Sequence, residues 1–206
     1  LSAFQNGLDI HSATAAGVYD VPIEEVTSDQ RRNAKTVNFS ITYGAGATNL
    51  SRQLGIKRVE ATELIENYFK QFQGLKNYMD ETIEFARANG YVKTLLGRRR
   101  KLRDINSKNG LTKSNAERMA INTPIQGTAA DMIKIAMINI HKEMKSRKLK
   151  SKMILQVHDE LVFDVYKPEL EEMKEMVEGL MKTAIPNLKV PILVGMDTGN
   201  NWLEAH

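Results

Sequence analysis

Cations and aromatic rings recur every four residues between residues 28 and 43, and this spacing places them along one face of a helix. An α-helix turns by about 100° per residue, so side chains four positions apart lie nearly above one another. The repeating side chains are two cations followed by two rings: Arg31, Lys35, Phe39 and Tyr43. Such a face combines positive charge with flat stacking surface. These are the features that phosphates and a base require of a nucleotide-binding surface.

Signals at both ends support this helix. Thr27 and Gln30 have the spacing of a capping box, and Gly44 lies where a left-handed residue commonly ends a helix. The same pattern also suits a solvated basic helix whose Val37 and Ile41 face a core. This segment alone leaves the two interpretations equally open.

A second segment, residues 153–165, consists of two apolar runs that meet at His158, Asp159 and Glu160. The runs favour strands and the polar residues between them do not, so we predict a hairpin over about 152–165 with carboxylates at its tip. Mg²⁺ commonly takes one or two protein carboxylates and completes its shell with water and phosphate oxygens. Asp159, with Glu160 beside it, could therefore hold a shared ion. The alternative is a turn aspartate bonded to its own backbone.

Together the two segments resemble the family A DNA polymerases, the DNA polymerase I group. The nucleotide-binding helix of that family has the pattern R-R-x-x-K-x-x-x-F/Y-x-x-x-Y-G, which this chain reproduces from Arg31 to Gly44. The metal-binding hairpin of the family reads V-H-D-E, as residues 157–160 do. Residues 90–100 and 117–131 are also similar to the family, in the same order. The similarity covers essentially the whole chain.

The resemblance implies template-directed DNA synthesis, in which a DNA-directed DNA polymerase adds deoxynucleotides from dNTPs to a primer 3′ end by two-metal phosphoryl transfer. It assigns catalysis to Lys35, Asp159 and Glu160, and it makes Asp159 a ligand of two Mg²⁺ ions. The implied nucleotide contacts are His11, Arg31, Arg32, Lys35, Phe39 and Tyr43. The implied contacts to the primer-template are Arg118, Asn122, Gln126, Gln156 and His158.

Some of these residues could have roles other than contacting DNA or nucleotide. Arg118, Asn122 and Gln126 are four apart and form a polar stripe that could test base-pair geometry, because minor-groove acceptors lie in nearly the same place for every pair. They could instead form a network of helix-capping and interhelical hydrogen bonds around Pro124. The basic residues 98–103 could contact phosphates or form a solvated loop, and neither implies base specificity. His11 could be an ordinary surface histidine.

One departure from the family stands out. Its first metal-binding carboxylate lies in a D-Y-S-x-I-E segment, which nothing in these 206 residues matches and which would fall shortly upstream of Leu1. We therefore expect a C-terminal piece with an incomplete metal site, inactive alone. Two rival functions stay open: another polynucleotide enzyme, such as a single-subunit RNA polymerase or a metal-dependent nuclease, and a nucleotide- or DNA-binding module without turnover.

Composition narrows the class of protein only slightly. The chain has 29 Lys and Arg against 25 Asp and Glu, a net charge of +4 that weakly favours a polyanionic partner. The absence of cysteine excludes disulfides and thiolate metal sites. We find no signal peptide and no apolar run near the ~20 residues of a membrane span, so we expect a cytoplasmic protein without membrane contact. The resemblance adds association with the nucleoid, and no obligate protein partner is evident.

The expected fold class is α+β. Residues 1–106 would be the mostly helical fingers of a right-hand polymerase, and residues 107–206 much of its palm, with a small antiparallel sheet. We expect helices over 10–18, 28–43, 47–54, 58–72 and 75–89, then a small hairpin around Gly97. Further helices are expected over 112–124, 126–147 and 168–183, the first two kinked or divided at Pro124, and a strand over 190–196. The face beginning at Arg31 and the tip bearing Asp159 should open toward one cleft.

Overall fold

The computed structural model describes residue 7 and residues 9–205. The chain divides into two compact units, Leu1–Thr128 and Ala129–His206, and one long helix contributes to both. The predicted subdomain boundary lies earlier in the chain, between residues 106 and 107. The assignment of fingers and palm to those two ranges stays a prediction.

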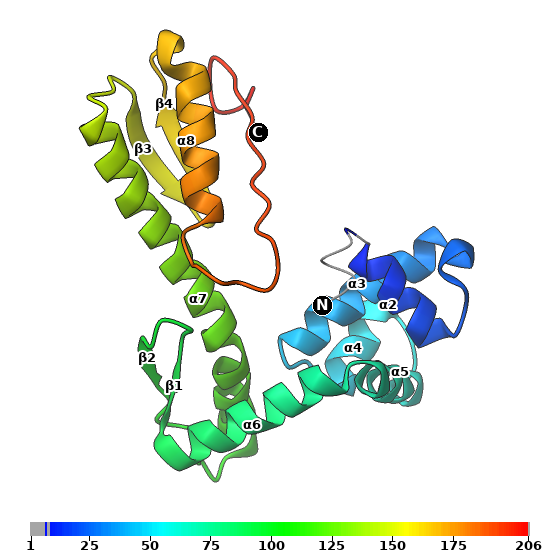
Figure 1. Cartoon of the computed structure of the whole chain (residues 1–206). Helices are drawn as coiled ribbons and strands as arrows, with labels where there is room; N and C mark the ends of the chain where they lie inside the picture. The colour runs from blue at the N-terminus through cyan, green and yellow to red at the C-terminus, as the bar shows by residue number, and fades with distance from the viewer. Residues whose placement is uncertain (1–6, 8, 206) are drawn as a thin grey trace. The chain divides into compact units, whose positions relative to one another are not determined.

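The first unit begins with a cluster of helices (Figure 1). They are α2 (Ile10–Tyr19), the short 3₁₀ helix η1 (Ile23–Glu25), α3 (Ser28–Thr42), α4 (Ala47–Leu54), α5 (Arg58–Gln71) and α6 (Gln73–Asn89). Their apolar faces enclose a core around Val37, Ile41, Leu50 and Tyr68. Burial raises the pKa of Tyr68 to about 12. The five α-helices that we expect before residue 90 are confirmed, with ends that differ by two residues or fewer.

A small hairpin follows α6. Strands β1 (Tyr91–Lys93) and β2 (Arg99–Lys101) pair antiparallel, and Gly97 takes a positive φ of 84° in the turn between them. Buried Val92, with Leu102 just beyond β2, packs against small residues of the next helix. The predicted hairpin around Gly97 is confirmed, and Arg99 and Arg100 stand on the exposed strand β2.

Helix α7 (Gly110–Ser146) is continuous through Pro124. The expected division into two helices at this proline is therefore wrong, and the alternative, a kink at Pro124, stays a prediction. A proline removes one backbone donor and crowds the preceding turn, at a cost of about 3 kcal/mol. Packing on both sides of Pro124 outweighs that cost: Ala116 and Ala120 are buried in one core, Ala136 and Ile140 in another.

The second unit packs a hairpin against two helices (Figure 1). Strands β3 (Lys152–Val157) and β4 (Glu160–Asp164) pair antiparallel and lead through η2 (Lys167–Glu169) to α8 (Leu170–Lys182). Ile140 and Met144 of α7 share a core with Met173 and Val177 of α8, and Phe163 of β4 packs on it. The predicted hairpin and the predicted helix over 168–183 are both confirmed.

The predicted strand over 190–196 is wrong, because the described residues beyond α8 form no strand. The fold class itself is confirmed, since the chain is mostly helical with small antiparallel sheets, β1–β2 and β3–β4. None of the helices in the described part of the chain combines the length and the apolar character that a bilayer span requires.

Candidate functional site

Helix α3 is fixed at both ends and along its inner face. The predicted capping box is present: the Gln30 N–H donates to Thr27 Oγ1 at 3.2 Å, and the Thr27 N–H donates to Gln30 Oε1 at 2.9 Å. Gly44 ends the helix with a φ of +77°. Val37 and Ile41 are each 1% exposed in the core of the first unit. This burial sets the rotation of the helix and leaves the opposite face to solvent.

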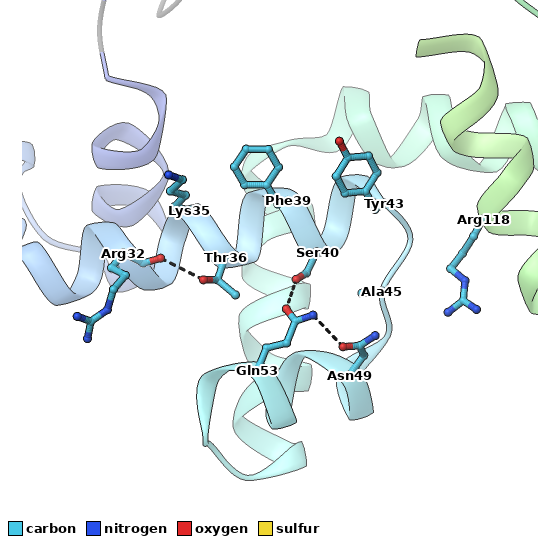
Figure 2. Close-up of a pocket in the computed structure, with 10 residues that line it drawn as sticks. All are labelled: Arg32, Lys35, Thr36, Phe39, Ser40, Tyr43, Ala45, Asn49, Gln53 and Arg118. Atoms are coloured by element: carbon cyan, nitrogen blue, oxygen red, sulfur yellow. Dashed lines mark hydrogen bonds between the residues drawn. The ribbon is translucent and has the colours of Figure 1, made fainter. Parts of the chain in front are cut away.

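The exposed face of α3 carries the predicted stripe. Phe39 is 48% exposed and Tyr43 44% exposed, and their rings are stacked with centroids 6.4 Å apart. Figure 2 shows Lys35, Phe39 and Tyr43 on the same side of the helix, as the four-residue spacing predicts. The His11 ring of α2 lies 5.9 Å from that of Phe39. One cation and three rings therefore form a continuous surface on α2 and α3, to which we refer as the α3 stripe: His11, Lys35, Phe39 and Tyr43.

The two arginines at the start of α3 are engaged by carboxylates. Arg31 Nε donates to Asp9 Oδ2 at 2.5 Å, and this guanidinium holds the pKa of Asp9 well below its usual range. Asp9 also caps α2 by accepting from the His11 N–H at 3.0 Å. Arg32 pairs with Asp29 at 2.9 Å, and both side chains are about three-quarters exposed. Nucleotide contacts of Arg31 and Arg32 stay predictions.

A cavity of about 470 Å³ opens beside α3. Figure 2 shows Thr36 and Ser40 pointing toward α4, away from the side of Lys35 and Phe39. Ser40 donates a short hydrogen bond to Gln53 Oε1, and Gln53 Nε2 donates to Asn49 Oδ1 at 2.9 Å. The lining is Arg32, Lys35, Thr36, Phe39, Ser40, Tyr43, Ala45, Asn49, Gln53 and Arg118.

Sequence reasoning missed this polar wall of α4. Asn49 and Gln53 are four apart on a helix that follows two closely spaced glycines, Gly44 and Gly46, and that pattern could have indicated a polar face turned toward α3. The cavity and the α3 stripe share three residues, Lys35, Phe39 and Tyr43.

The predicted DNA-contacting residues of α7 are only partly brought to this site. Arg118 lines the cavity and hydrogen bonds to Asn115, one turn earlier. Asn122 Nδ2 donates to the Tyr43 carbonyl at 3.4 Å, a long bond that ties α7 to the end of α3. Gln126 is exposed. The bond of Asn122 fits the interhelical interpretation, and the groove contacts of these residues stay a prediction.

The β3–β4 hairpin presents its polar turn to solvent. His158 adopts a φ of +53° and Gln156 Nε2 donates to its carbonyl at 2.9 Å, which closes the turn. Asp159 lies in the turn and Glu160 opens β4, and both are exposed. Their oxygens are the donors that Mg²⁺ prefers. Within the described residues no group of three or more His, Asp or Glu could enclose a metal, so this tip fits a shared site rather than a closed one.

Comparison with known proteins identifies the family. The model of DNA polymerase family A matches residues 1–204, and the chain belongs to this family. The chain is 50% identical over all 206 residues to DNA polymerase I of Streptococcus pneumoniae strain TIGR4, and 46% identical over 205 residues to DNA polymerase I of Bacillus caldotenax. It spans about a quarter of the length of these relatives, 23% in each case.

A solved structure agrees at the level of the fold. It is the POL domain of Pol1 from M. smegmatis in complex with DNA primer-template and dNTP. The match has a TM-score of 0.92 and 43% sequence identity, and it covers 99% of this chain and 36% of that one. The resemblance that the motifs indicate is therefore confirmed by sequence and by fold.

Proposed function

We propose that this chain supplies the nucleotide-binding helix and one metal-binding carboxylate of a DNA-directed DNA polymerase that adds dNTPs to a primer 3′ end. The observation that carries the proposal is the α3 stripe. In it a cation that pairs with no carboxylate of the described residues is followed by two stacked, half-exposed rings on a helix that is capped and anchored. Family membership and the complex of the M. smegmatis protein with primer-template and dNTP support it.

In this proposal Lys35 binds the triphosphate of the incoming nucleotide. No carboxylate of the described residues pairs with it, so its Nζ is available to donate to phosphate oxygens and to stabilise the departing pyrophosphate. The Phe39 ring packs on the sugar and base, and Tyr43 occupies or guards the position of the template base. Arg31, Arg32 and His11 add donors at the phosphate end.

Asp159, with Glu160 beside it, holds divalent cations together with a second carboxylate that these 206 residues do not contain. When bound, two Mg²⁺ ions would neutralise the charge that develops on the transferred phosphoryl group. Arg118, Asn122, Gln126, Gln156 and His158 contact the primer-template, Arg118 from the wall of the cavity beside α3. We place the parent enzyme in the cytoplasm with the nucleoid.

The test is a chimera. The region of S. pneumoniae DNA polymerase I that matches all 206 residues is replaced by this chain, which is feasible at 50% identity. We expect primer extension that depends on template, dNTP and Mg²⁺, and we expect Asp159→Asn to reduce it to background while the melting temperature is unchanged. Full extension by the Asp159→Asn chimera would contradict the assignment of this carboxylate.

One observation favours a second function for the chain taken alone. The tip of the hairpin offers Asp159 and Glu160 but no enclosing set of ligands among the described residues. We therefore expect the 206-residue chain by itself to bind dNTP weakly, extend no primer and release no labelled ends from DNA. Loss of labelled ends without nucleotides would instead indicate a nuclease.

A further inference from the structure

The second unit contains a cavity that the proposed function does not use. It has a volume of about 500 Å³ and lies where α7 ends and β3 begins (Figure 1). Its exposed rim carries a histidine and three lysines, and we refer to it as the basic cavity: His141, Lys145, Lys148 and Lys152. No described residue that lines it has a carboxylate. All of the lining residues belong to the second unit.

The lysines of the basic cavity are not neutralised by their neighbours. Among the described residues no ion pair engages any of the three ammonium groups. Asp164 lies opposite Lys152 across the hairpin, yet no ion pair joins these two described side chains. The carboxylate of Glu143, on the same helix, pairs with Arg147 at 2.8 Å. Uncompensated cations around one concavity produce a positive potential that attracts a ligand with several negative charges.

The end of α7 does not require these lysines for its own capping. Cations commonly gather at a helix C-terminus because the last carbonyl groups lack partners. Here the Leu149 N–H donates to the Met144 carbonyl at 3.0 Å, and the Lys148 N–H donates to the Lys145 carbonyl at 3.2 Å. These two bonds form a Schellman motif, which satisfies the carbonyls through the backbone.

Lys148 occupies the left-handed position of this motif, with a φ of +56°. Glycine is the usual residue there, because a Cβ makes the left-handed conformation unfavourable. A strained residue at the rim of a cavity indicates a role for its side chain. The helix end is thus built at a conformational cost, and the result is a third ammonium group beside the cavity.

The floor of the basic cavity is apolar. Met144 is 7% exposed in the core of the second unit, and half-buried Leu149 and Met153 pack against that core. Methionine side chains adapt to the shape of an apolar ligand group. The described lining contains no arginine, and the helix end presents carbonyls rather than N–H groups, so the fixed donors typical of phosphate sites are missing there. Cations around an apolar floor instead suit a ligand that combines carboxylates with an apolar side chain.

We propose that the basic cavity binds an acidic peptide segment of a partner protein, with carboxylates on the lysines and one apolar side chain against Met144 and Met153. Because a strand advances about 3.3 Å per residue, the six residues of β3 place this cavity roughly 20 Å from the turn that bears Asp159. The partner can therefore bind while the turn holds a metal ion. The proposal is independent of the proposed function.

Fluorescence anisotropy tests the binding with a labelled peptide of aspartates around one central leucine. We expect saturable binding by the 206-residue chain, and a loss of about tenfold or more in affinity when Lys145→Glu and Lys148→Glu are combined. Lys142→Glu with Lys167→Glu makes the same change of charge at exposed positions outside the cavity. At about 0.15 M salt, where charges more than about 8 Å apart are largely screened, this control should change the affinity by less than about twofold. Absence of saturable binding, or equal losses in the two double variants, would overturn the proposal.

NMR of ¹³C-labelled methionine methyl groups locates the bound peptide. The chain has ten methionines, which single replacements assign. The peptide should shift the signals of Met144 and Met153 and leave that of Met79, in the core of the first unit, unchanged. Shifts elsewhere without shifts at Met144 and Met153 would contradict the site.

Two further probes identify the kind of occupant. The same peptide with serine in place of leucine should bind about tenfold more weakly, because the buried apolar side chain is lost. Equal binding of the two peptides would contradict the role of the apolar floor. A single-stranded oligothymidylate of equal charge should not displace the leucine peptide. If it does so and shifts the same methyl signals, the basic cavity is a nucleic-acid site and the proposal is wrong.

Lys148→Gly separates binding from folding. Glycine adopts the left-handed conformation without strain, so this variant should raise the midpoint of urea unfolding while it weakens peptide binding severalfold. Unchanged affinity, or a lower midpoint, would overturn the role of Lys148. In the chimera, Lys145→Glu with Lys148→Glu should leave primer extension unchanged. A chimera that extends no primer would count against the proposed function alone, since peptide binding is measured on the 206-residue chain.

Discussion

Glu169 shows how a single carboxylate can hold two segments of a small unit together. It accepts from the N–H of Lys150 at 2.9 Å, from the N–H of Ser151 at 2.9 Å and from Ser151 Oγ at 2.6 Å. These bonds, the one from Lys150 first, lower the pKa of the Glu169 carboxyl. The carboxylate joins the segment before β3 to the start of α8, in the same unit as Asp159.

The sign of the pH dependence follows from that lowered pKa. The folded state favours the ionised form, so the stabilisation is complete above about pH 4.5, the ordinary pKa of a glutamate, and is lost as the pH falls through the lower value in the folded chain. We expect Glu169→Gln to destabilise the chain at pH 7 in urea unfolding, and the difference from the unmodified chain to shrink below about pH 4.5. Glu175→Gln, an exposed glutamate of α8, is the control and should change little at either pH.

Lys35 is the residue on which the nucleotide assignment depends most. In the chimera, Lys35→Ala should raise the KM for dNTP by roughly 10- to 100-fold, the loss expected for one hydrogen bond to a charged group. Steady-state kinetics at saturating primer-template measures it. Lys57→Ala, which removes an exposed lysine just before α5, should leave the KM unchanged. Equal effects of the two substitutions would indicate general electrostatic attraction rather than a contact.

At the scale of elements, the close approach of the β1–β2 hairpin to α7 depends on a glycine. A Cβ added to Gly127 would lie 2.6 Å from Thr94 Cγ2, and Thr94 is buried. Further bonds join the same elements: the Leu95 N–H donates to Thr128 Oγ1 at 2.9 Å, and Arg98 donates to the Gly127 carbonyl at 3.1 Å. The basic hairpin is thus fixed to α7 beside Gln126.

We therefore expect Gly127→Ala to destabilise the chain by about 1–3 kcal/mol, the usual cost of an overpacked contact. Thr94→Ser removes the methyl group that the new Cβ would meet and keeps the hydroxyl that binds the Arg98 N–H at 3.1 Å. The double variant should recover much of the loss, which urea unfolding measures as a coupling energy. Gly179→Ala, in α8 with open space around it, should be neutral or stabilising by up to about 1 kcal/mol.

The helices and turns that depend on residues close together in the chain could be predicted from the sequence. The capping box at Thr27 and the left-handed Gly44 define α3 within a few residues, and the polar turn at His158 separates two strands. The predictions at Pro124 and at residues 190–196 failed because their outcome is not local. Pro124 lies within one long helix whose buried residues before and after it belong to two different cores, and a segment becomes a strand only beside a partner with free backbone groups.

The part of the candidate site that lies on one helix could also be predicted, because spacing within a helix determines which side chains share a face. A spacing of four places Lys35, Phe39 and Tyr43 on one face whatever the surroundings, as observed. The engagement of Arg31 by Asp9 and the wall formed by Gln53 depend on contacts between helices, which no spacing within one helix encodes.

At the scale of the whole molecule, the proposed function requires two distant segments to act on one nucleotide. Lys35 belongs to the first compact unit and Asp159 to the second. A triphosphate bound by Lys35 must also reach a cation held by Asp159, because phosphoryl transfer needs the binding groups and the metal ions on the same phosphates. A common cleft is thus a requirement of the account and stays a prediction.

A crystal structure of the chimera with primer-template, an unreactive dNTP analogue and Mn²⁺ tests this requirement most directly. Anomalous scattering locates the cation independently of the protein. We expect one nucleotide with its triphosphate within hydrogen-bond distance of Lys35 Nζ and an Mn²⁺ that joins the same triphosphate to Asp159. A nucleotide bound at Lys35 with the Mn²⁺ of Asp159 in a separate place, and no phosphate between them, would contradict the account.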